Sequence, residues 1–223
     1  MVVEIIENAL QMVVAGACFF YSVIETMRTK SRAWIILMLF FAELFLGNLY
    51  WQLYLAFFGE NPQFPFQSEF CWDVSFGFLL LLARCFSRGR ISIKKDPVLI
   101  VIPIYTASWA IFYMNWGRYA DNVICAILMA ALILRCVYSL KSIKGRYEGA
   151  ESVDHSTVKL YMAILLFCTA EYLSWTASCF FFADSFKSPY IWADFMVTIS
   201  FVLLIPAVKA CNPGAYGSLP GED

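Results

Sequence analysis

The amino-acid sequence predicts an all-α integral membrane protein with seven transmembrane helices, its N-terminus outside and its C-terminus inside. Hydrophobic residues fill 61% of the 223 positions and charged residues only 15%, a composition outside the range of soluble domains. Seven apolar segments each have about the 20 residues that a helix needs to cross the hydrocarbon core of a bilayer. The basic residues, in addition, are concentrated in alternate connections.

Each apolar segment is interpreted as one helix, and the connections between the helices are short. The first segment includes the last three residues of the acidic start "MVVEIIE". This start lacks the basic leader and small-residue cleavage site of a signal peptide, so we expect the first segment to remain as a span. The predicted spans cover residues 5–24, 33–58, 70–86, 97–114, 122–140, 158–182 and 189–211.

The orientation is predicted from the positions of Lys and Arg, because basic residues stay on the cytoplasmic side during insertion. The first, third and fifth connections contain "MRTKSR", "ARCFSRGRISIKK" and "LRCVYSLKSIKGR". With Lys159 and Lys209 at inner helix ends, 14 of the 16 basic residues lie on one side, and Arg118 and Lys187 lie on the other. This distribution predicts an outside N-terminus, and we expect the protein in the plasma (inner) membrane.

Three features of the first half of the sequence return in the same order in the second half. A cysteine, a Tyr-Ser pair and a basic run occur near the inner ends of the first and fifth spans, in "CFFYSVIETMRTKSR" and "CVYSLKSIKGR". An Ala-Glu pair lies in the second and sixth spans, and a Trp and an Asp lie near the start of the third and seventh. The matching Tyr, Glu and Asp residues are separated by 117, 128 and 121 positions.

These matches predict a single membrane domain, residues 1–223, with a parallel 3+1+3 internal repeat. The repeats would cover residues 1–90 and 122–211, and the linking helix 97–114 would give both the same orientation. The Gly and Pro content of residues 212–223 predicts a flexible cytoplasmic tail.

Four carboxylates within the predicted spans are candidate ligand- or ion-binding residues. Glu43 and Glu171 lie about ten residues from the inner helix ends, near the bilayer midplane, whereas Asp73 and Asp194 lie near the outer surface. An ionised carboxylate in hydrocarbon costs several kcal/mol unless a partner, water or a ligand compensates it. Two structural interpretations stay open: interfacial acids for Asp73 and Asp194, and protonated, hydrogen-bonded carboxyl groups for Glu43 and Glu171.

Aromatic and amide side chains accompany the two glutamates at helical spacing. Trp51 follows Glu43, and Trp175 follows Glu171, on the same predicted helix. Tyr50 shares a similar face with Glu43, and Asn48 belongs to a neighbouring polar stripe. Mixed aromatic and polar faces suit a water-accessible cavity better than lipid. The predicted ligand- or ion-binding residues are therefore Glu43, Glu171, Asp73, Asp194, Trp51, Trp175, Asn48 and Tyr50.

Several classes of function are disfavoured by the residues themselves. The single histidine, His155, falls in a predicted cytoplasmic connection, and no HExxH, GxSxG or phosphate-binding glycine motif occurs, so we expect no enzyme, catalytic residue, metal or cofactor. The last span offers only Lys209, at its inner end, for a retinal Schiff base. No basic face suits nucleic acid, and the cysteines are interpreted as small packing residues.

Seven spans, an outside N-terminus and a three-plus-one-plus-three repeat resemble the architecture of SWEET sugar transporters and PnuC-type vitamin transporters. The resemblance concerns architecture alone. SWEET-type helices carry a proline in the first helix of each triplet, whereas the first and fifth spans here contain none. No residue roles are therefore taken from these families.

The sequence leads to two functional hypotheses. The first is a transporter whose central acidic, aromatic-lined cavity takes a small polar or cationic solute, with Glu43 or Glu171 as a proton- or cation-coupling site. The alternative is a sensory or accessory module that binds a ligand from the outer side and signals to a cytoplasmic partner protein. The expected partners are the lipid bilayer, the solute, and either a second copy of the chain or a cytoplasmic protein.

Overall fold

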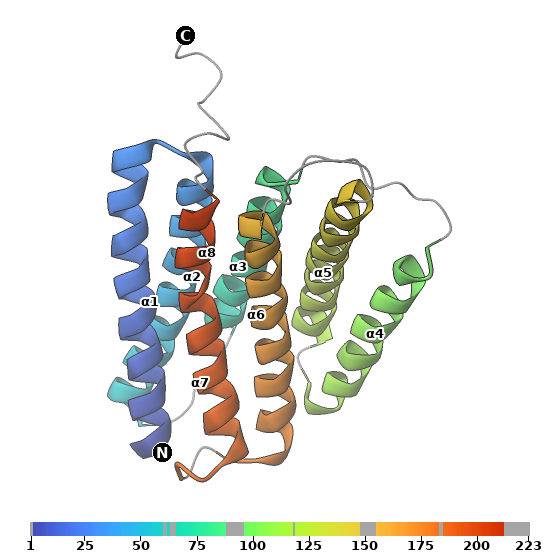
Figure 1. Ribbon diagram of the computed structural model, residues 1–223. Coiled ribbons are helices and arrows are strands. Elements are labelled where there is room, and N and C mark those ends of the chain that lie inside the picture. The colour runs from blue at the N-terminus through green and yellow to red at the C-terminus, as the bar shows by residue number, and fades with distance from the viewer. Residues whose placement is uncertain are drawn as a thin grey trace.

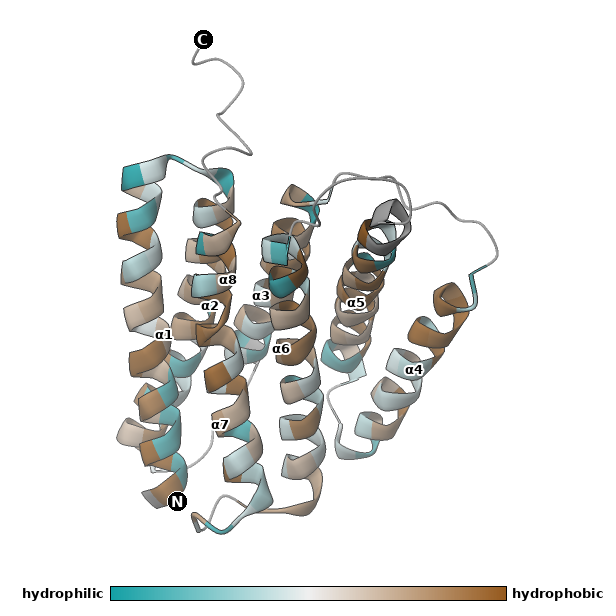
Figure 2. Cartoon of the chain, viewed as in Figure 1, coloured by the Kyte–Doolittle hydropathy of each residue, from teal (hydrophilic) through white to brown (hydrophobic). Residues whose placement is uncertain are grey.

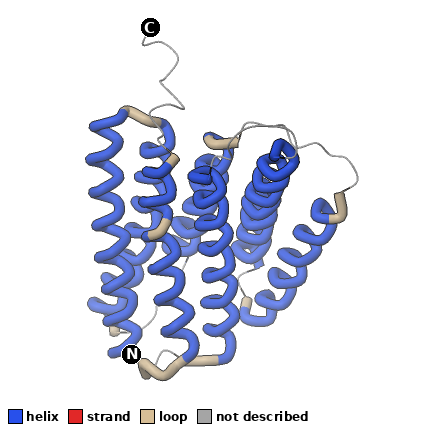
Figure 3. Tube along the Cα trace, viewed as in Figure 1, coloured by secondary structure: helices blue, strands red, loops and turns tan. Residues whose placement is uncertain are grey.

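The structure is a computed structural model that describes residues 2–59, 62, 66–87, 96–117, 119–147, 155–182 and 185–211. Every regular element in these residues is a helix, and none is a strand (Figure 3). Six helices or helix pairs are long and apolar enough to cross a membrane. The predicted all-helical architecture of membrane type is therefore confirmed. The tail 212–223 lies outside the described residues.

The helices are α1 (Val2–Thr29), α2 (Arg32–Phe58), α3 (Phe66–Cys85), α4 (Val98–Tyr113) with a 3₁₀ turn (Met114–Trp116), α5 (Tyr119–Tyr147), α6 (His155–Phe180), α7 (Pro189–Val202) and α8 (Leu204–Ala210). Three helices, α1, α3 and α5, extend beyond the predicted apolar segments by a turn or more. The helix α6 begins three residues before its predicted segment, at His155, so this histidine starts a helix.

The helix α3 is the predicted span that does not belong to the six apolar ones. Its 20 residues are enough to cross a bilayer, but with Glu69, Asp73 and Arg84 it is not among the helices apolar enough to span a membrane by composition. It lies nevertheless against α2 and α5 inside the bundle. The helix α3, with its three charged residues, therefore packs between two other helices.

The last predicted span is broken into α7 and α8 at Leu203. Pro206 has no N–H to donate to the carbonyl of Val202, and its ring crowds that carbonyl. The backbone is held across the break by hydrogen bonds from Leu203 N to Ile199 O (3.2 Å) and from Ala207 N to Leu203 O (3.3 Å). The two helices therefore continue in the same direction (Figure 1).

The helices pack in a closed order. Each helix of the series α1, α2, α3, α5, α6 and α7 contacts the next one, and α7 contacts α1. The helix α4 stands outside this order, on α5 (Figure 1). Apolar residues, brown in Figure 2, run along the helices, and many point outward: Phe20 is 65% exposed and Ile127 64%. Such a surface suits lipid contact better than water.

Five buried phenylalanines fill the middle of the bundle, and we call them the phenylalanine layer. They come from α2, α3, α6 and α7, and none exposes more than 1% of its surface. Their rings meet mostly edge to face, with centroids 5.0–6.0 Å apart, a favourable arrangement for aromatic pairs. The members are Phe40, Phe41, Phe76, Phe167 and Phe201.

The peripheral helix α4 is attached at both ends. Near its C-terminal end, the Tyr113 hydroxyl lies 2.9 Å from the Thr176 hydroxyl of α6. Just before its start, Asp96 accepts hydrogen bonds from Lys141 Nζ of α5 (2.7 Å) and from the Val98 amide (3.0 Å). These hydrogen bonds, chiefly that from Lys141, lower the pKa of the exposed Asp96 carboxyl.

A glycine of α2 permits its close approach to α3, and its substitution tests this contact. A Cβ on Gly47 would lie 2.9 Å from Trp72 Nε1 and 3.3 Å from Cys71 Cβ. We expect Gly47→Ala to lower the melting temperature in detergent, because overpacking costs about 1–3 kcal/mol. The matched control is Gly77→Ala in α3, where no atom lies within 4 Å of the added Cβ.

Because alanine favours a helix over glycine by about 1 kcal/mol, Gly77→Ala should leave the melting temperature unchanged or raise it. Equal responses of the two variants would show that α2 and α3 do not pack closely at Gly47.

Candidate functional site

Two neighbouring cavities occupy one end of the bundle, where α1, α3, α5 and α7 begin and α2 and α6 end. This is the end marked by the N-terminus in Figure 1. The larger cavity has a volume of about 460 Å³ and lies among α1, α2, α3, α6 and α7. The smaller has a volume of about 300 Å³ and lies among α3, α5, α6 and the turn after α4. Both volumes suit a small-molecule ligand.

Three carboxylates line the larger cavity: Glu4, Glu171 and Asp194. Ser174 Oγ of α6 donates a hydrogen bond of 3.0 Å to Asp194 Oδ1 of α7. Asp194 is 9% exposed, and the half-buried Glu171 lies one turn before Ser174 on the same face of α6. No Lys or Arg among the described residues lines this cavity. The lining is therefore strongly acidic.

A further carboxyl group, Glu7 of α1, lies behind Asp194. It is 1% exposed, and neither of its oxygens accepts a hydrogen bond from a donor. The side chain lies against the carboxyl group of Asp194. One turn further along α1, Gln11 also lines the cavity and donates a hydrogen bond of 3.4 Å to Thr198 Oγ1 of α7. Polar residues of α1 thus complete the site.

Aromatic side chains form the remaining walls of the larger cavity. Trp51 of α2 and Trp72 of α3 have ring centroids 6.1 Å apart, and Trp175 of α6 lies across from them. The Trp175 ring packs edge to face against the rings of Phe76 and Tyr113, with ring centroids 6.0 Å and 6.1 Å away. The cavity therefore combines carboxylates with the faces or edges of three indole rings.

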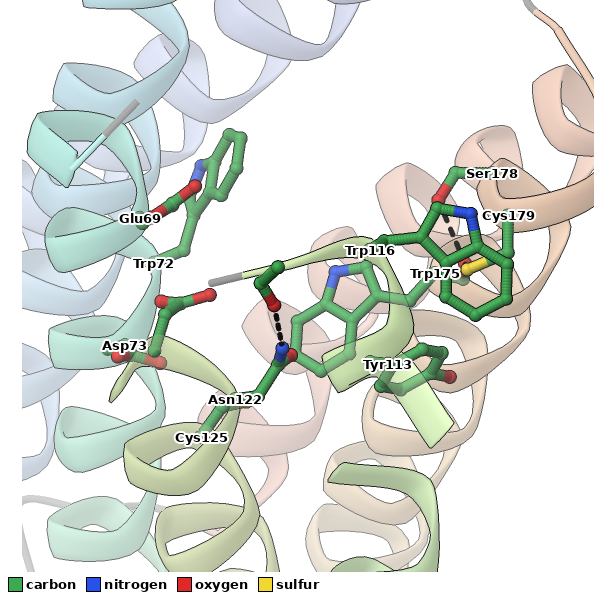
Figure 4. A pocket seen from close by; sticks show the side chains of 12 residues that line it. Glu69, Trp72, Asp73, Tyr113, Trp116, Asn122, Cys125, Trp175, Ser178 and Cys179 are labelled. Atoms are coloured by element: carbon green, nitrogen blue, oxygen red, sulfur yellow. Dashed lines mark hydrogen bonds between the residues drawn. The ribbon is translucent and has the colours of Figure 1, made fainter. Parts of the chain in front are cut away.

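The smaller cavity, next to the larger one, repeats this combination (Figure 4). Asp73 of α3 and Asp121 of α5 are neighbours there, next to Cys125. Figure 4 shows Asp73 on one side and Trp116 and Trp175 on the other. The two cavities share three lining residues, Trp72, Trp175 and Ser178, so they are adjacent parts of one acidic, aromatic region.

Five of the eight predicted site residues line these cavities. Glu171, Asp194, Trp51 and Trp175 line the larger one, Trp175 also lines the smaller, and Asp73 lines the smaller. The other three residues, Glu43, Asn48 and Tyr50, line neither.

The position of Glu43 follows from the phase of α2. Leu44 and Trp51, which are seven residues apart, line the larger cavity. Glu43 and Tyr50 are also seven residues apart, but each lies one residue earlier in the chain. They therefore point about 100° away from Leu44 and Trp51 around the helix. The Glu43 carboxyl accordingly lies against Cys71 of α3, and Asn48 is buried at 2% exposure.

Sequence reasoning missed the contribution of α1. Glu4, Asn8 and Gln11 all line the larger cavity, and their spacing of four and three residues places them on one helical face. The signal was Glu4, a carboxylate of the acidic start of the chain, with the polar Asn8 and Gln11 following at helical spacing. Glu69 and Asp121, which line the smaller cavity, were also missed.

The hydrogen bond between α6 and α7 in the larger cavity can be tested by mutation. Ser174→Ala removes the buried donor to Asp194, and a hydrogen bond to a charged group contributes about 1.5–3 kcal/mol. We expect a lower melting temperature in detergent. The control is Ser178→Ala, one turn later, an exposed residue whose hydroxyl donates to the Trp175 carbonyl of its own helix. A Ser178→Ala variant as unstable as Ser174→Ala would contradict a structural role for the Ser174–Asp194 bond.

Comparisons with known proteins complete the description of the site. Among the described residues, no group of three or more His, Cys, Asp or Glu side chains is arranged to hold a metal ion. Comparison of the chain with protein-family models, with curated proteins and with solved structures gave no match. The proposals below therefore rest on the residues and geometry of this chain.

Proposed function

We propose that this protein is a membrane transporter for a small organic cation. One observation carries the proposal: a cavity of about 460 Å³ is lined by Glu4, Glu171 and Asp194 and by no described Lys or Arg. Carboxylates inside a bundle of apolar helices are costly unless something compensates them. A cation that enters the cavity would supply this compensation.

The aromatic walls favour an organic ammonium ion over a strongly hydrated inorganic ion. Trp51, Trp72 and Trp175 line the same cavity as the carboxylates. Indole rings attract cations electrostatically, and aromatic cages are a common recognition site for quaternary ammonium groups. The remaining volume would accept the apolar part of such a ligand.

We further infer that α1–α3 and α5–α7 are repeats joined by α4, in a seven-span protein with an outside N-terminus. A half-turn about the axis of the closed helix order would take α1 to α5, α2 to α6 and α3 to α7, and each main helix contact would then fall on another main contact. The same half-turn would exchange two carboxyl pairs: Glu7–Asp194 between α1 and α7, and Asp121–Asp73 between α5 and α3. These pairs support the parallel repeat.

The phenylalanine layer lies beneath the larger cavity and separates it from the opposite end of the bundle. Phe201 belongs to both, because it lines the cavity and its ring lies 6.0 Å from that of Phe41. A transporter would have to part this layer. A sensory module would keep it closed and pass a helix shift to a cytoplasmic partner, so the closed layer also favours this second candidate.

The orientation is tested by reporter fusions or cysteine accessibility. Gly59, which ends α2, should lie outside. Residue Gly149, in the connection before α6 and outside the described residues, should lie in the cytoplasm because of the basic residues around it. Both sites on one side of the membrane would exclude the seven-span topology.

Cation binding is tested by isothermal titration calorimetry of the detergent-solubilised protein with choline. The control ligand is 3,3-dimethylbutan-1-ol, which has the same shape without the charge. We expect choline alone to bind. Because Glu171 lines the larger cavity and Glu43 does not, Glu171→Gln should weaken binding about tenfold or more, equivalent to about 1.4 kcal/mol. Glu43→Gln should change it by less than about twofold.

Two further results decide between the candidates. Equal binding of choline and the alcohol, or no binding of either, would contradict the cation site. Choline binding without uptake of radiolabelled choline into proteoliposomes would favour the sensory module over the transporter.

A further inference from the structure

The Glu7 carboxyl group is buried more deeply than any other carboxylate at this end of the bundle. It is 1% exposed, compared with 9% for Asp194 and 8% for Asp73. Neither Glu7 oxygen accepts a hydrogen bond from a donor. An isolated ionised carboxylate in such surroundings is very costly. Glu7 therefore needs a proton or a counter-charge that the protein itself does not supply.

Asp194 connects Glu7 with the larger cavity. On the cavity side, Asp194 belongs to the lining and accepts the 3.0 Å hydrogen bond from Ser174 Oγ. On the other side it faces the Glu7 carboxyl group. A ligand in the cavity can therefore contact Asp194 without reaching Glu7.

The groups around this pair are acidic or neutral. Among the described residues, three titratable groups interact electrostatically with one member of the pair: Glu4 of α1, Tyr190 of α7 and Glu171 of α6. The acidic residue of α2, Glu43, lies against Cys71 of α3 instead. Two neighbouring carboxyl groups in these surroundings cannot both be ionised at low cost.

We propose that Glu7 and Asp194 share one proton when the larger cavity holds no cation, and that an organic cation bound beside Asp194 displaces this proton. The proton leaves to water in the cavity, and the two carboxylates then face the positive charge of the ligand. This proposal rests on the cation site described above. It makes the site an exchanger of one cation for one proton.

Exchange has a defined pH dependence. The proton competes with the cation, so below the pH at which the empty site loses its proton, cation affinity falls as the pH falls. When one proton is displaced per cation, the affinity for the cation changes by at most about tenfold per pH unit. The pair titrates as a unit, so this slope belongs to both carboxyl groups together.

The experiment is calorimetric titration of the full-length protein with choline, between about pH 5.5 and 8, where the pKa values of buried carboxyl pairs can fall. Titration in buffers of different ionisation enthalpy counts the protons released. We expect the wild type to approach one proton per choline at the acidic end. Glu7→Gln should bind choline with no proton release, because its amide can donate to Asp194 permanently.

Two variants complete the test. Asp194→Asn should also abolish proton release and should weaken binding, since it removes a carboxylate from the cavity lining. The matched control is Glu25→Gln, a glutamate of the same helix that is also buried, at 7% exposure, but lies at the opposite end and bonds Tyr21. Its proton release should equal that of the wild type.

The possible failures separate the two proposals. Choline binding by the wild type without proton release, or with release that persists unchanged in Glu7→Gln, would overturn the exchange and leave the cation site intact. Absence of choline binding at every pH would overturn the cation site and the exchange together. A melting curve for each variant ensures that the comparison is between folded proteins.

Discussion

The structure depends above all on carboxyl groups that lie inside a bundle of apolar helices at one end. Around the larger cavity these are Glu4, Glu7, Glu171 and Asp194, from α1, α6 and α7. Helices packed tightly around such groups would leave them in low dielectric, at a cost of several kcal/mol each. An open cavity with hydroxyl and amide groups in its walls reduces this cost. The acidic residues therefore favour an open cavity at this end of the bundle over tight packing.

The closed order of helices explains how residues far apart in the sequence reach one cavity. The first helix lies against the last long one, which brings Glu7 and Asp194 together across 187 positions of chain, the same separation as that of the hydrogen-bonded Gln11 and Thr198. The contact of α3 with α5 does the same for Asp73 and Asp121. Each acidic pair thus lies between a helix of the first half and a helix of the second, so relative movement of the halves would separate or join both pairs.

The sequence was sufficient for the features that depend on one helix at a time. Apolar length predicted the membrane class and the helices, and carboxylates in apolar surroundings pointed to Glu171, Asp194 and Asp73. Features that depend on neighbouring helices were not predictable. A rotation of about 100° decides that Trp51 lines the cavity and Glu43 does not, and only packing sets that phase. The role proposed for Glu7 required knowledge that α1 lies against α7.

The same packing places the floor of the cavity next to its acidic lining. Phe201 lines the larger cavity, and its ring also contacts Phe41 within the phenylalanine layer. Seven residues before Phe201, on the same face of α7, lies Asp194. A change of charge at Asp194 alters the attraction between α7 and α1, and any rotation of α7 in response would carry Phe201 with it. The helix breaks after Val202, where Pro206 removes a backbone hydrogen bond, and α8 beyond the break packs on α6. One short helix, α7, therefore carries both Asp194 of the proposed cation site and Phe201 of the phenylalanine layer.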